Sequence, residues 1–453
     1  MPDAPEAAIA SAKPRRGEEL ELEVSGLAHG GRGLARCDGY VVFVAGGLPG
    51  DRVRARVDRR RRDFAEVTSV ELLAPSPDRV ADLCLHDGEP CPGAPWQGLP
   101  YERQLAEKER LLDEALRRLG GLGGFALEPI VPAVEPWRYR NKLEYSFGRR
   151  GRELVLGFHR RGSWTEVVDA AGCLLASERA DEARAGLACW AASLWLEPYD
   201  RRRRAGVLRN LVVREGRRTG QVQTRLVTSA AEIPRPPVDL HTVVEGPGGG
   251  TAGPTGSLGA ERLVERVGGV EVEVSATAFL QTNTETADRL YATAAEYADL
   301  RGRERVFDLY CGVGTIALAL ARDAGEVWGI EAIPEAVADA ERNAERNGIA
   351  NARFLAADAR LGLRPLVAET GQPDLVVVDP PRAGLPKKVV RRVLEAAPRR
   401  IVYVSCNPTT LAPSAAQLTE GGYRLRRVRP VDMFPQTPHI ECVAEFEQVA
   451  GNR

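Results

Sequence analysis

Residues 305–315 read RVFDLYCGVGT, in which an apolar run is followed by two closely spaced glycines. The run at 305–310 is typical of a buried strand, and the glycines let the backbone approach a ligand where a helix begins. Glu331 ends the next predicted strand about 20 residues further on, where nucleotide-binding folds place a carboxylate on ribose hydroxyls. The stretch therefore predicts a nucleotide-binding turn, with a tight turn that binds no ligand as the alternative.

Strands and helices alternate through the last third of the chain. The predicted strands lie at 305–310, 327–331, 353–355, 375–378 and 401–404, and the predicted helices lie at 316–321, 334–347 and 387–397. This alternation predicts a doubly wound parallel sheet, the α/β class of Rossmann-like domains. We assign this domain to residues 271–453.

Two strands of this sheet are followed by side chains that carry chemistry. The strand at 401–404 leads into Ser405-Cys406-Asn407-Pro408, and the strand at 375–378 leads into Asp379-Pro380-Pro381-Arg382. Ligands of open α/β sheets bind beyond the carboxyl ends of the strands, so Cys406 lies where a nucleophile is useful. Asp379 enters the same crevice, where it can accept a hydrogen bond from a base N–H. A buried, inert thiol is the alternative for Cys406.

The first 270 residues predict a disordered arm and two further domains. The arm covers residues 1–16. Residues 17–73 alternate short apolar runs with glycine turns, which predicts a small OB-like β-barrel, and the run Arg59-Arg60-Arg61-Arg62 lies between two of its strands. This segment resembles a TRAM domain, which implies RNA binding. Residues 74–270 predict a mainly β central domain, with a glycine-rich flexible loop at 246–259 and a helix at 101–119 that packs on the last domain.

Composition and charge narrow the class of protein. The chain of 453 residues has a net charge of -1, so bulk charge alone indicates no nucleic-acid partner. No stretch is long and apolar enough to span a bilayer, and residues 1–13 lack the apolar core of a secretion signal. The eight cysteines are far apart in the sequence. We therefore expect a cytoplasmic protein with reduced thiols, in which metal or catalytic roles of cysteine outrank disulfides. We also expect no membrane association and no obligate protein partner.

Four stretches together carry a family resemblance. They are FLQTN at 279–283, DLYCGVGT at 308–315, SCNP at 405–408 and FPQTPHIE at 434–441. In this order they resemble the RNA 5-methyluridine methyltransferase family, over nearly the full chain. The resemblance implies a class I methyltransferase domain, S-adenosylmethionine as the cofactor and RNA as the partner. With its barrel, the chain resembles the 23S ribosomal RNA branch of the family more than the bacterial transfer RNA branch, which usually lacks the barrel.

The resemblance also implies roles for single residues. Cys406 matches the nucleophile of the family, and Glu441 matches its general base. Asp379 matches the residue that fixes the target uracil, and Phe279 matches an aromatic residue near it. The implied cofactor contacts are Gln281, Tyr310, Gly312, Gly314, Thr315, Glu331 and Asp358.

The chemistry of uracil explains this set of residues. Uracil C5 is a poor nucleophile, but addition of a thiolate at C6 turns C4–C5 into an enolate that can take a methyl group. A base must then remove the C5 hydrogen so that the cysteine can leave, and the target base must be flipped out of its stack. We expect cationic groups or helix N-termini to lower the pKa of Cys406.

Three other functions remain open from the sequence. The first is methylation of a tRNA uridine at C5. The second is an amino-methyltransferase that uses Asp379-Pro380-Pro381, although Arg382 stands where such enzymes normally have an aromatic residue. The third is a non-catalytic RNA-binding assembly factor with a vestigial cofactor fold.

Cys84, Cys91 and Cys173 are candidate metal ligands. Relatives that bind an iron–sulfur cluster have three cysteines in the first stretch and a fourth later, whereas Ala94 stands at the third position here. Such a cluster normally takes four thiolates. We therefore expect a weak, incomplete or absent cluster, and a cluster with a non-cysteine fourth ligand stays open.

Overall fold

The structure is a computed structural model, and it describes residues 13–160, 162–230, 232–236, 239–245 and 250–449. Most of the predicted arm at residues 1–16 lies outside this set. The chain divides into two compact units. The first comprises Met1–Asp82, Pro95–Glu107 and Gln436–Pro438, and the second comprises Leu83–Ala94, Lys108–Pro435 and His439–Arg453.

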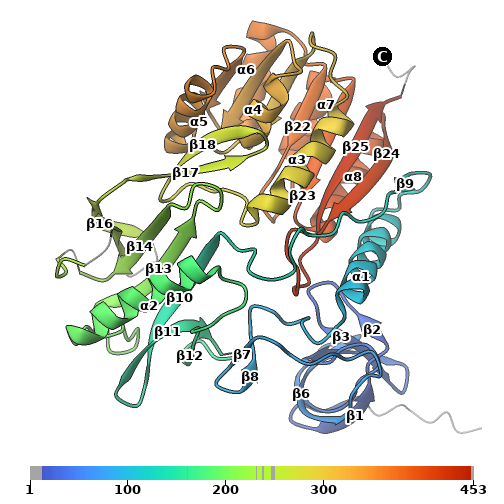
Figure 1. The fold of residues 1–453 in the computed structure, drawn as a ribbon. Helices are drawn as coiled ribbons and strands as arrows, with labels where there is room; N and C mark the ends of the chain where they lie inside the picture. The colour runs from blue at the N-terminus through green and yellow to red at the C-terminus, as the bar shows by residue number, and fades with distance from the viewer. Residues whose placement is uncertain (1–12, 161, 231, 237–238, 246–249, 450–453) are drawn as a thin grey trace, which may run out of the picture. The chain divides into compact units, whose positions relative to one another are not determined.

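The first unit contains the β-barrel that the alternating sequence predicts. Its strands are β1 (Glu19–Glu23), β2 (Gly26–Leu27), β3 (Gly33–Cys37), β4 (Tyr40–Ala45), β5 (Arg52–Arg60) and β6 (Phe64–Ala74), in the order β1-β5-β6-β4-β3-β2. In β4 the side chains of Tyr40, Val42 and Val44 are buried and those between them are not, which is the period of two that a one-sided core requires. Figure 1 shows these strands curled into a small barrel.

The second unit contains a sheet of eight strands. They are β9 (Ala126–Leu127), β19 (Arg305–Leu309), β20 (Glu326–Glu331), β21 (Ala352–Ala356), β22 (Leu375–Val378), β23 (Arg400–Ser405), β24 (Tyr423–Val431) and β25 (Glu441–Gln448). The order is β21-β20-β19-β22-β23-β25-β24-β9, and the first five strands are parallel. All four residues of β22 are buried, as expected for a parallel strand covered on both faces. The predicted doubly wound sheet is confirmed.

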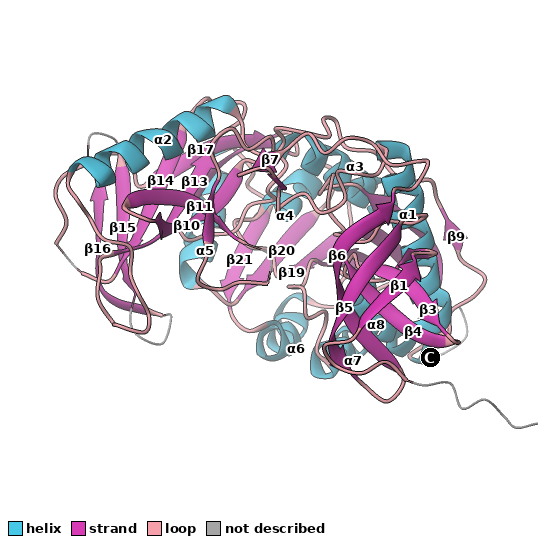
Figure 2. Ribbon diagram, turned by 90° about the horizontal axis from the view of Figure 1, so that it is seen from below, coloured by secondary structure: helices cyan, strands magenta, loops and turns pink. Residues whose placement is uncertain are grey.

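Helices cover both faces of this sheet. They are α3 (Thr284–Ala298), α4 (Thr315–Ala321), α5 (Pro334–Arg346), α6 (Ala359–Thr370), α7 (Lys387–Ala396) and α8 (Pro408–Glu420). Figure 2 shows α3 and α4 on one face and α6 and α7 on the other. A helix-like segment formed by α1 (Tyr101–Glu114) and a π-helical turn (Ala115–Leu119) ends against α8. None of the helices in the described ranges is long and apolar enough to cross a bilayer.

A second sheet fills the middle of the chain. Its strands are β10 (Lys142–Arg150), β11 (Glu153–His159), β12 (Val167–Asp169), β13 (Leu208–Glu215), β14 (Val222–Thr228), β15 (Leu240–Glu245) and β16 (Thr251–Leu258), and α2 (Glu178–Ser193) packs on it. The β7–β8 hairpin (Leu85–His86, Glu89–Pro90) shares the core of this sheet. The β17–β18 hairpin (Arg262–Val267, Val270–Ser275) packs mainly on α3, α4 and α5 of the eight-stranded sheet.

The glycine-rich segment 246–259 corrects one expectation. It was predicted to be a flexible loop, but residues Thr251–Leu258 form β16, which pairs with β15 from Leu240↔Leu258 to Glu245↔Thr251. Backbone hydrogen bonds to β15 hold this strand at the edge of the sheet, where the weak strand preference of glycine and Pro254 is tolerated. Residues 246–249 lie outside the described set.

A buried ion pair joins α1 to the segment after β24. Lys108 Nζ lies 2.5 Å from Asp432 Oδ1 and donates to the carbonyl oxygen of Phe434 at 2.9 Å, and both charged side chains are fully buried. Burial lowers the pKa of Lys108, while the charge of Asp432 raises it. Because neither charge meets water, each depends on the other for its stability in the folded protein.

Lys108→Met is therefore expected to destabilise the protein by about 3–5 kcal/mol, since it leaves Asp432 buried without a cation. Urea unfolding followed by circular dichroism measures the change. The double variant Lys108→Met/Asp432→Leu should recover most of the loss, and Lys387→Met, on the exposed side of α7, should change stability by less than about 0.5 kcal/mol. A double variant as unstable as the single one would contradict this account.

Candidate active site

The strand order creates a crevice at one edge of the eight-stranded sheet. From β19 the chain adds β20 and β21 on one side and then β22 and β23 on the other. The order thus reverses between β19 and β22, and ligands of open α/β sheets bind beyond the carboxyl ends of the strands at such a point. Tyr310, Glu331, Asp379 and Cys406 stand at or just after these carboxyl ends. Four of the predicted site residues therefore share one edge.

The glycine loop after β19 has the backbone that a close ligand requires. Gly312 and Gly314 have φ of 55° and 86°, and Tyr310 also has a positive φ, 67°. A Cβ at Gly314 would come within 3.1 Å of Ala340 and Phe354, whereas a Cβ at Gly312 would meet no atom within 4 Å. Gly314 is thus required by packing, and Gly312 leaves open space at the crevice. A non-glycine residue in this conformation, such as Tyr310, stores strain that is typical of functional sites.

Glu331 is fixed at the end of β20 by the backbone. Gly312 N–H donates to Glu331 Oε2 at 3.2 Å, and Ile333 N–H donates to Oε1 at 2.9 Å. Burial, and then the charges of Asp358 and Glu331, raise the pKa of Tyr310 to about 12. Asp358 therefore belongs to the same group, although it also caps α6 by accepting from Arg360 N–H at 2.8 Å. These contacts bring together Tyr310, Gly312, Glu331 and Asp358.

Of three other predicted site residues, two contact side chains of the protein and one is exposed. Thr315 accepts a hydrogen bond from the hydroxyl of Tyr291, with 3.2 Å between the oxygens. Gln281 is buried, and its Nε2 lies 3.5 Å from Asp379 Oδ2. Phe279 is 61% exposed, which is unusual for a phenylalanine and leaves its ring accessible to a partner.

The pairing of β23 with β25 brings Cys406 and Glu441 together. The register of the two strands ends at the pair Ser405↔Cys442, and the Cys442 thiol donates to Ser405 O at 3.6 Å. One step further, Cys406 faces Glu441 across the two strands, where side chains of opposed residues lie close together. Glu441 is buried, and within the described part of the chain its Oε1 has no hydrogen-bond partner.

Three acidic groups in this crevice favour their protonated forms. Burial raises the pKa of Asp379 to about 7, although the hydrogen bond from Gln281 opposes this shift. Burial and then the charge of Asp379 raise the pKa of Glu441 well above its usual value. Burial, followed by the charges of Glu441 and Asp379, raises the pKa of Cys406 to about 12. The expected lowering of the Cys406 pKa is therefore wrong, because burial, and then the two carboxylates, outweigh a backbone hydrogen bond and the single cation, Arg382.

Sequence reasoning missed two residues of this site. Asp308 lies buried in β19 beneath the glycine loop, and burial followed by the charge of Asp379 raises its pKa well above the usual range. Asn141, from the segment before β10, donates to the backbone oxygen of Gln281 at 2.9 Å and to Thr284 Oγ1 at 2.8 Å. A carboxylate within an apolar strand was the available signal for Asp308. Nothing in the local sequence marks Asn141, because its partners lie about 140 residues away.

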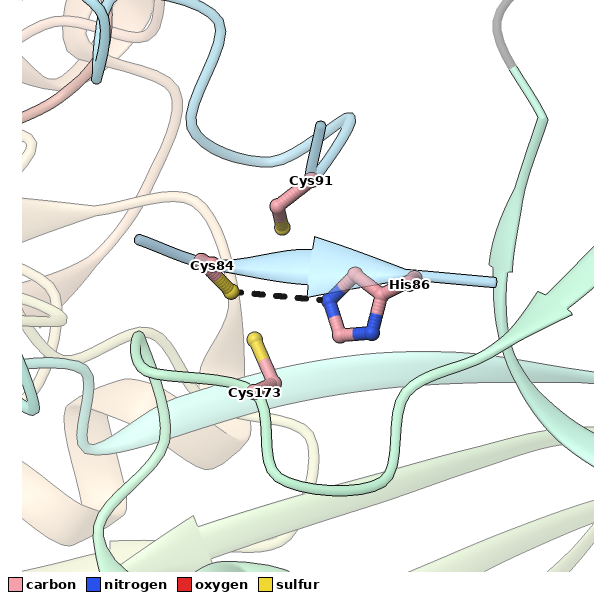
Figure 3. Close-up of side chains that lie close together, drawn as sticks. All are labelled: Cys84, His86, Cys91 and Cys173. Carbon is pink, nitrogen blue, oxygen red and sulfur yellow. Dashed lines mark hydrogen bonds between the residues drawn. The ribbon is translucent and has the colours of Figure 1, made fainter. Parts of the chain in front are cut away.

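A separate cluster contains the three cysteines predicted to bind metal. Cys84, Cys91 and Cys173 are buried and come together with His86, and the ligand atoms of all four residues lie within 4.8 Å of one another. Figure 3 shows the three sulfur atoms and the imidazole pointing toward a common centre. Ala94 is buried in the same core and offers no ligand atom. No local sequence signal marks His86, which becomes the fourth member of the cluster only through the β7–β8 hairpin.

Comparison with known proteins agrees with this geometry. A family profile described as tRNA (Uracil-5-)-methyltransferase matches residues 269–448, and a TRAM domain profile matches residues 13–67. An uncharacterized RNA methyltransferase of Halalkalibacterium halodurans is 35% identical over 453 residues, which cover 95% of this chain and 97% of the relative. One from Nitratidesulfovibrio vulgaris is 37% identical over 452 residues, with 94% and 95% covered.

A solved structure is similar along almost the whole chain. It is the Pyrococcus abyssi tRNA (uracil-54, C5)-methyltransferase in complex with S-adenosyl-L-homocysteine. The TM-score is 0.76 at 28% identity, and the match covers 94% of this chain and 100% of the other. The length of these matches, together with the two domain profiles, shows that the chain belongs to the RNA (uracil-5-)-methyltransferase family.

Proposed function

We propose that this chain methylates C5 of a uridine in 23S ribosomal RNA through a covalent bond between Cys406 and C6 of the base. The register of β23 and β25 is the observation that carries the proposal. The register ends at the pair Ser405↔Cys442, so Cys406 and Glu441 are the next residues to oppose each other. They lie at the edge where α/β sheets bind their ligands. A thiol and a carboxylate side by side are the two groups that this reaction needs.

The reaction balances with these two side chains and the Asp379 carboxylate, which takes up the thiol proton. S-adenosylmethionine is the methyl donor and, when bound, supplies an electrophilic methyl group on a sulfonium. The Cys406 sulfur bonds to C6 of uracil, and the C5=C6 electrons make C5 a nucleophile that bonds to the methyl carbon as its bond to the sulfonium sulfur breaks. Glu441 then takes the C5 hydrogen as a proton, the C5=C6 bond re-forms, and the C6–sulfur bond breaks with its electrons returning to Cys406.

The raised pKa values assign the proton movements. A carboxylate with a high pKa binds protons strongly, so burial makes ionised Glu441 a strong base for the C5 hydrogen. The same burial opposes the ionisation of Cys406, so the thiol gives up its proton as its sulfur bonds to C6. Because Glu441 must stay ionised to take the C5 hydrogen, Asp379 accepts the thiol proton and returns it to the Cys406 sulfur when the C6–sulfur bond breaks.

The remaining site residues are proposed to bind either the cofactor or the target uracil. Glu331, held by two backbone N–H groups, is suited to bind ribose hydroxyls beside the open space at Gly312. Gly314, Thr315, Tyr310, Asp358 and Gln281 complete the proposed cofactor contacts. Asp379 is suited to accept a hydrogen bond from the uracil N–H, and exposed Phe279 is suited to stack on a flipped base.

The β-barrel supports RNA as the substrate. The barrel offers a basic hairpin, Arg59–Arg62, whose Arg62 side chain is 93% exposed and can contact phosphates. Because the similar Pyrococcus abyssi enzyme acts on a tRNA uracil, a tRNA uridine is the second candidate. The two substrates are distinguished by locating the product in cellular RNA.

Replacing Cys406 with alanine should abolish methylation, because no other group can activate C5. In a strain lacking this gene, the wild-type chain should restore 5-methyluridine in 23S rRNA, whereas Cys406→Ala should not. In vitro the variant should lose at least about 10³-fold in rate while it still binds S-adenosylmethionine in calorimetry. Cys189→Ala, at an exposed cysteine, is the matched control. Methylation by Cys406→Ala would refute the nucleophile, and restored 5-methyluridine in tRNA alone would move the substrate to tRNA.

Glu441→Gln should stop the reaction after methyl transfer, because the amide cannot take the C5 hydrogen and the C6–sulfur bond then stays. The measurement is a denaturing gel, on which RNA should migrate with the protein. Glu447→Gln, at a half-exposed position of the same strand, should form no lasting adduct. If Glu441→Gln turned over normally without an adduct, another group would have to be the base.

The rate of a single turnover should rise with pH through about 7, where Asp379 ionises. A carboxyl group is ionised only above its pKa, and burial raises the pKa of Asp379 to about 7 and that of Glu441 as well, so acid protonates the groups that must accept protons. Gln281→Leu removes the hydrogen bond that lowers the Asp379 pKa. The rise in rate should therefore occur at a pH about 0.5–1 unit higher in this variant. Gln417→Leu, on α8, should leave it in place. A downward shift in Gln281→Leu would contradict the assignment.

A further inference from the structure

A buried group of metal-binding side chains lies in the β7–β8 segment, and the methyl-transfer reaction makes no use of it. Cys84 precedes β7, His86 ends β7, Cys91 follows β8, and Cys173 comes from the turn after β12. All four belong to the second compact unit. Three thiols and an imidazole with converging ligand atoms are a donor set for a metal ion rather than for packing alone.

The spacing of the ligand atoms matches one metal ion. Bonds of about 2.3 Å from zinc to sulfur and about 2.0–2.1 Å from zinc to nitrogen, arranged as a tetrahedron, set sulfur and nitrogen about 3.5 Å apart. Cys84 Sγ lies 3.6 Å from His86 Nε2, and no pair among the four ligand atoms is more than 4.8 Å apart. The distance from Cys84 Sγ to His86 Nε2 therefore already matches the distance between a sulfur and a nitrogen ligand of one tetrahedral zinc ion.

The same residues do not fit a four-iron cluster with four cysteines. Such a cluster takes one thiolate on each of its iron atoms, with the inorganic core between them, so its ligands stand farther apart than those of one ion. Only three cysteines converge among the described residues, and Ala94 occupies the position of another cysteine in cluster-bearing relatives. The fourth donor here is an imidazole, from a position that the sequence pattern of those relatives does not use.

We propose that Cys84, His86, Cys91 and Cys173 bind a single Zn²⁺ ion in a closed tetrahedral site. Four protein ligands leave no open position, which is the mark of a structural zinc site. Zn²⁺ is redox-inactive, accepts thiolate and imidazole together and imposes no geometry beyond the tetrahedron. The site thereby serves the fold rather than the chemistry at Cys406.

The surroundings of the site suit a centre with net negative charge. Three thiolates, a neutral imidazole and Zn²⁺ sum to one negative charge. Leu174 N–H donates to Cys84 Sγ at 3.3 Å, a hydrogen bond that stabilises a thiolate. Arg140 brings a cation to this part of the core, since its backbone N–H donates to Leu175 O at 3.1 Å, two residues after Cys173.

The ion has a definite structural task. The β7 and β8 strands have two residues each and pair only through Leu85↔Pro90 and His86↔Glu89, which is too short to be stable alone. Zinc joins this hairpin, through Cys84, His86 and Cys91, to the turn at Cys173 on the central sheet. Metal binding then contributes directly to the folding free energy of this segment.

Metal analysis of the full chain tests the proposal directly. Protein produced in medium that contains both iron and zinc, and purified without oxygen, should hold one zinc per chain and no acid-labile sulfide. X-ray absorption at the zinc edge should show three sulfur ligands and one nitrogen ligand. Replacement by Co²⁺ should give the visible bands of a tetrahedral thiolate site. Four irons and four sulfides per chain would overturn the proposal, and so would native protein whose Cys84, Cys91 and Cys173 are metal-free and reactive.

Variants isolate the role of His86. His86→Ala should lower zinc affinity by more than about 100-fold in chelator competition, since losing a ligand costs more than losing an outer-shell partner. His86→Cys should retain zinc, and His159→Ala, at an exposed histidine of β11, should bind it as the wild type does. Cys173→Ser should lose zinc, whereas Cys189→Ser should keep it. Unchanged zinc affinity in His86→Ala would exclude the imidazole. If that variant misfolds, the ligand set measured on the wild type still decides.

Discussion

The antiparallel pairing of β25 with β23 is the constraint on which the active site depends. It is the only contact between adjacent strands that can set Glu441, near the end of the chain, beside Cys406 at the sheet edge among the described elements. Because side chains alternate between faces, a shift of one residue would turn Glu441 away from the thiol. Nearly every residue of β23 and β25 is buried, so a slip would force side chains of different size to repack on both faces of the sheet.

Burial also decides the charge state of the crevice. Asp308, Asp379, Glu441 and Cys406 all have raised pKa values, and in each case removal from water is the largest cause. In such a site the neutral forms are favoured, and a carboxylate that does ionise is a strong base. Such a site is a poor place for a free thiolate but a good one for proton transfer between a thiol, a carbon and a carboxylate, because each group binds its proton strongly and none is stabilised by solvent.

The sequence predicts this architecture well where a signal is local. Apolar runs at 305–310, 375–378 and 401–404 became β19, β22 and β23 within one or two residues, because parallel strands buried on both faces are continuous apolar runs. Signals that depend on tertiary contacts were missed. The direction of the Cys406 pKa shift follows from carboxylates on other strands, His86 joins the cysteines only when β7 pairs with β8, and β16 forms from a glycine-rich segment because β15 offers a free edge.

Cys406 and the cysteine cluster around Cys84 show how neighbouring groups determine whether a thiol is protonated or ionised. At Cys406 two carboxylates and burial favour the protonated thiol, and a protonated thiol binds metal poorly because the metal must displace its proton. At Cys84 a backbone N–H and converging donors favour a thiolate, and Arg140 supplies a nearby positive charge. The protein can therefore hold a soft metal ion in one place and keep a nucleophilic sulfur free of it in another.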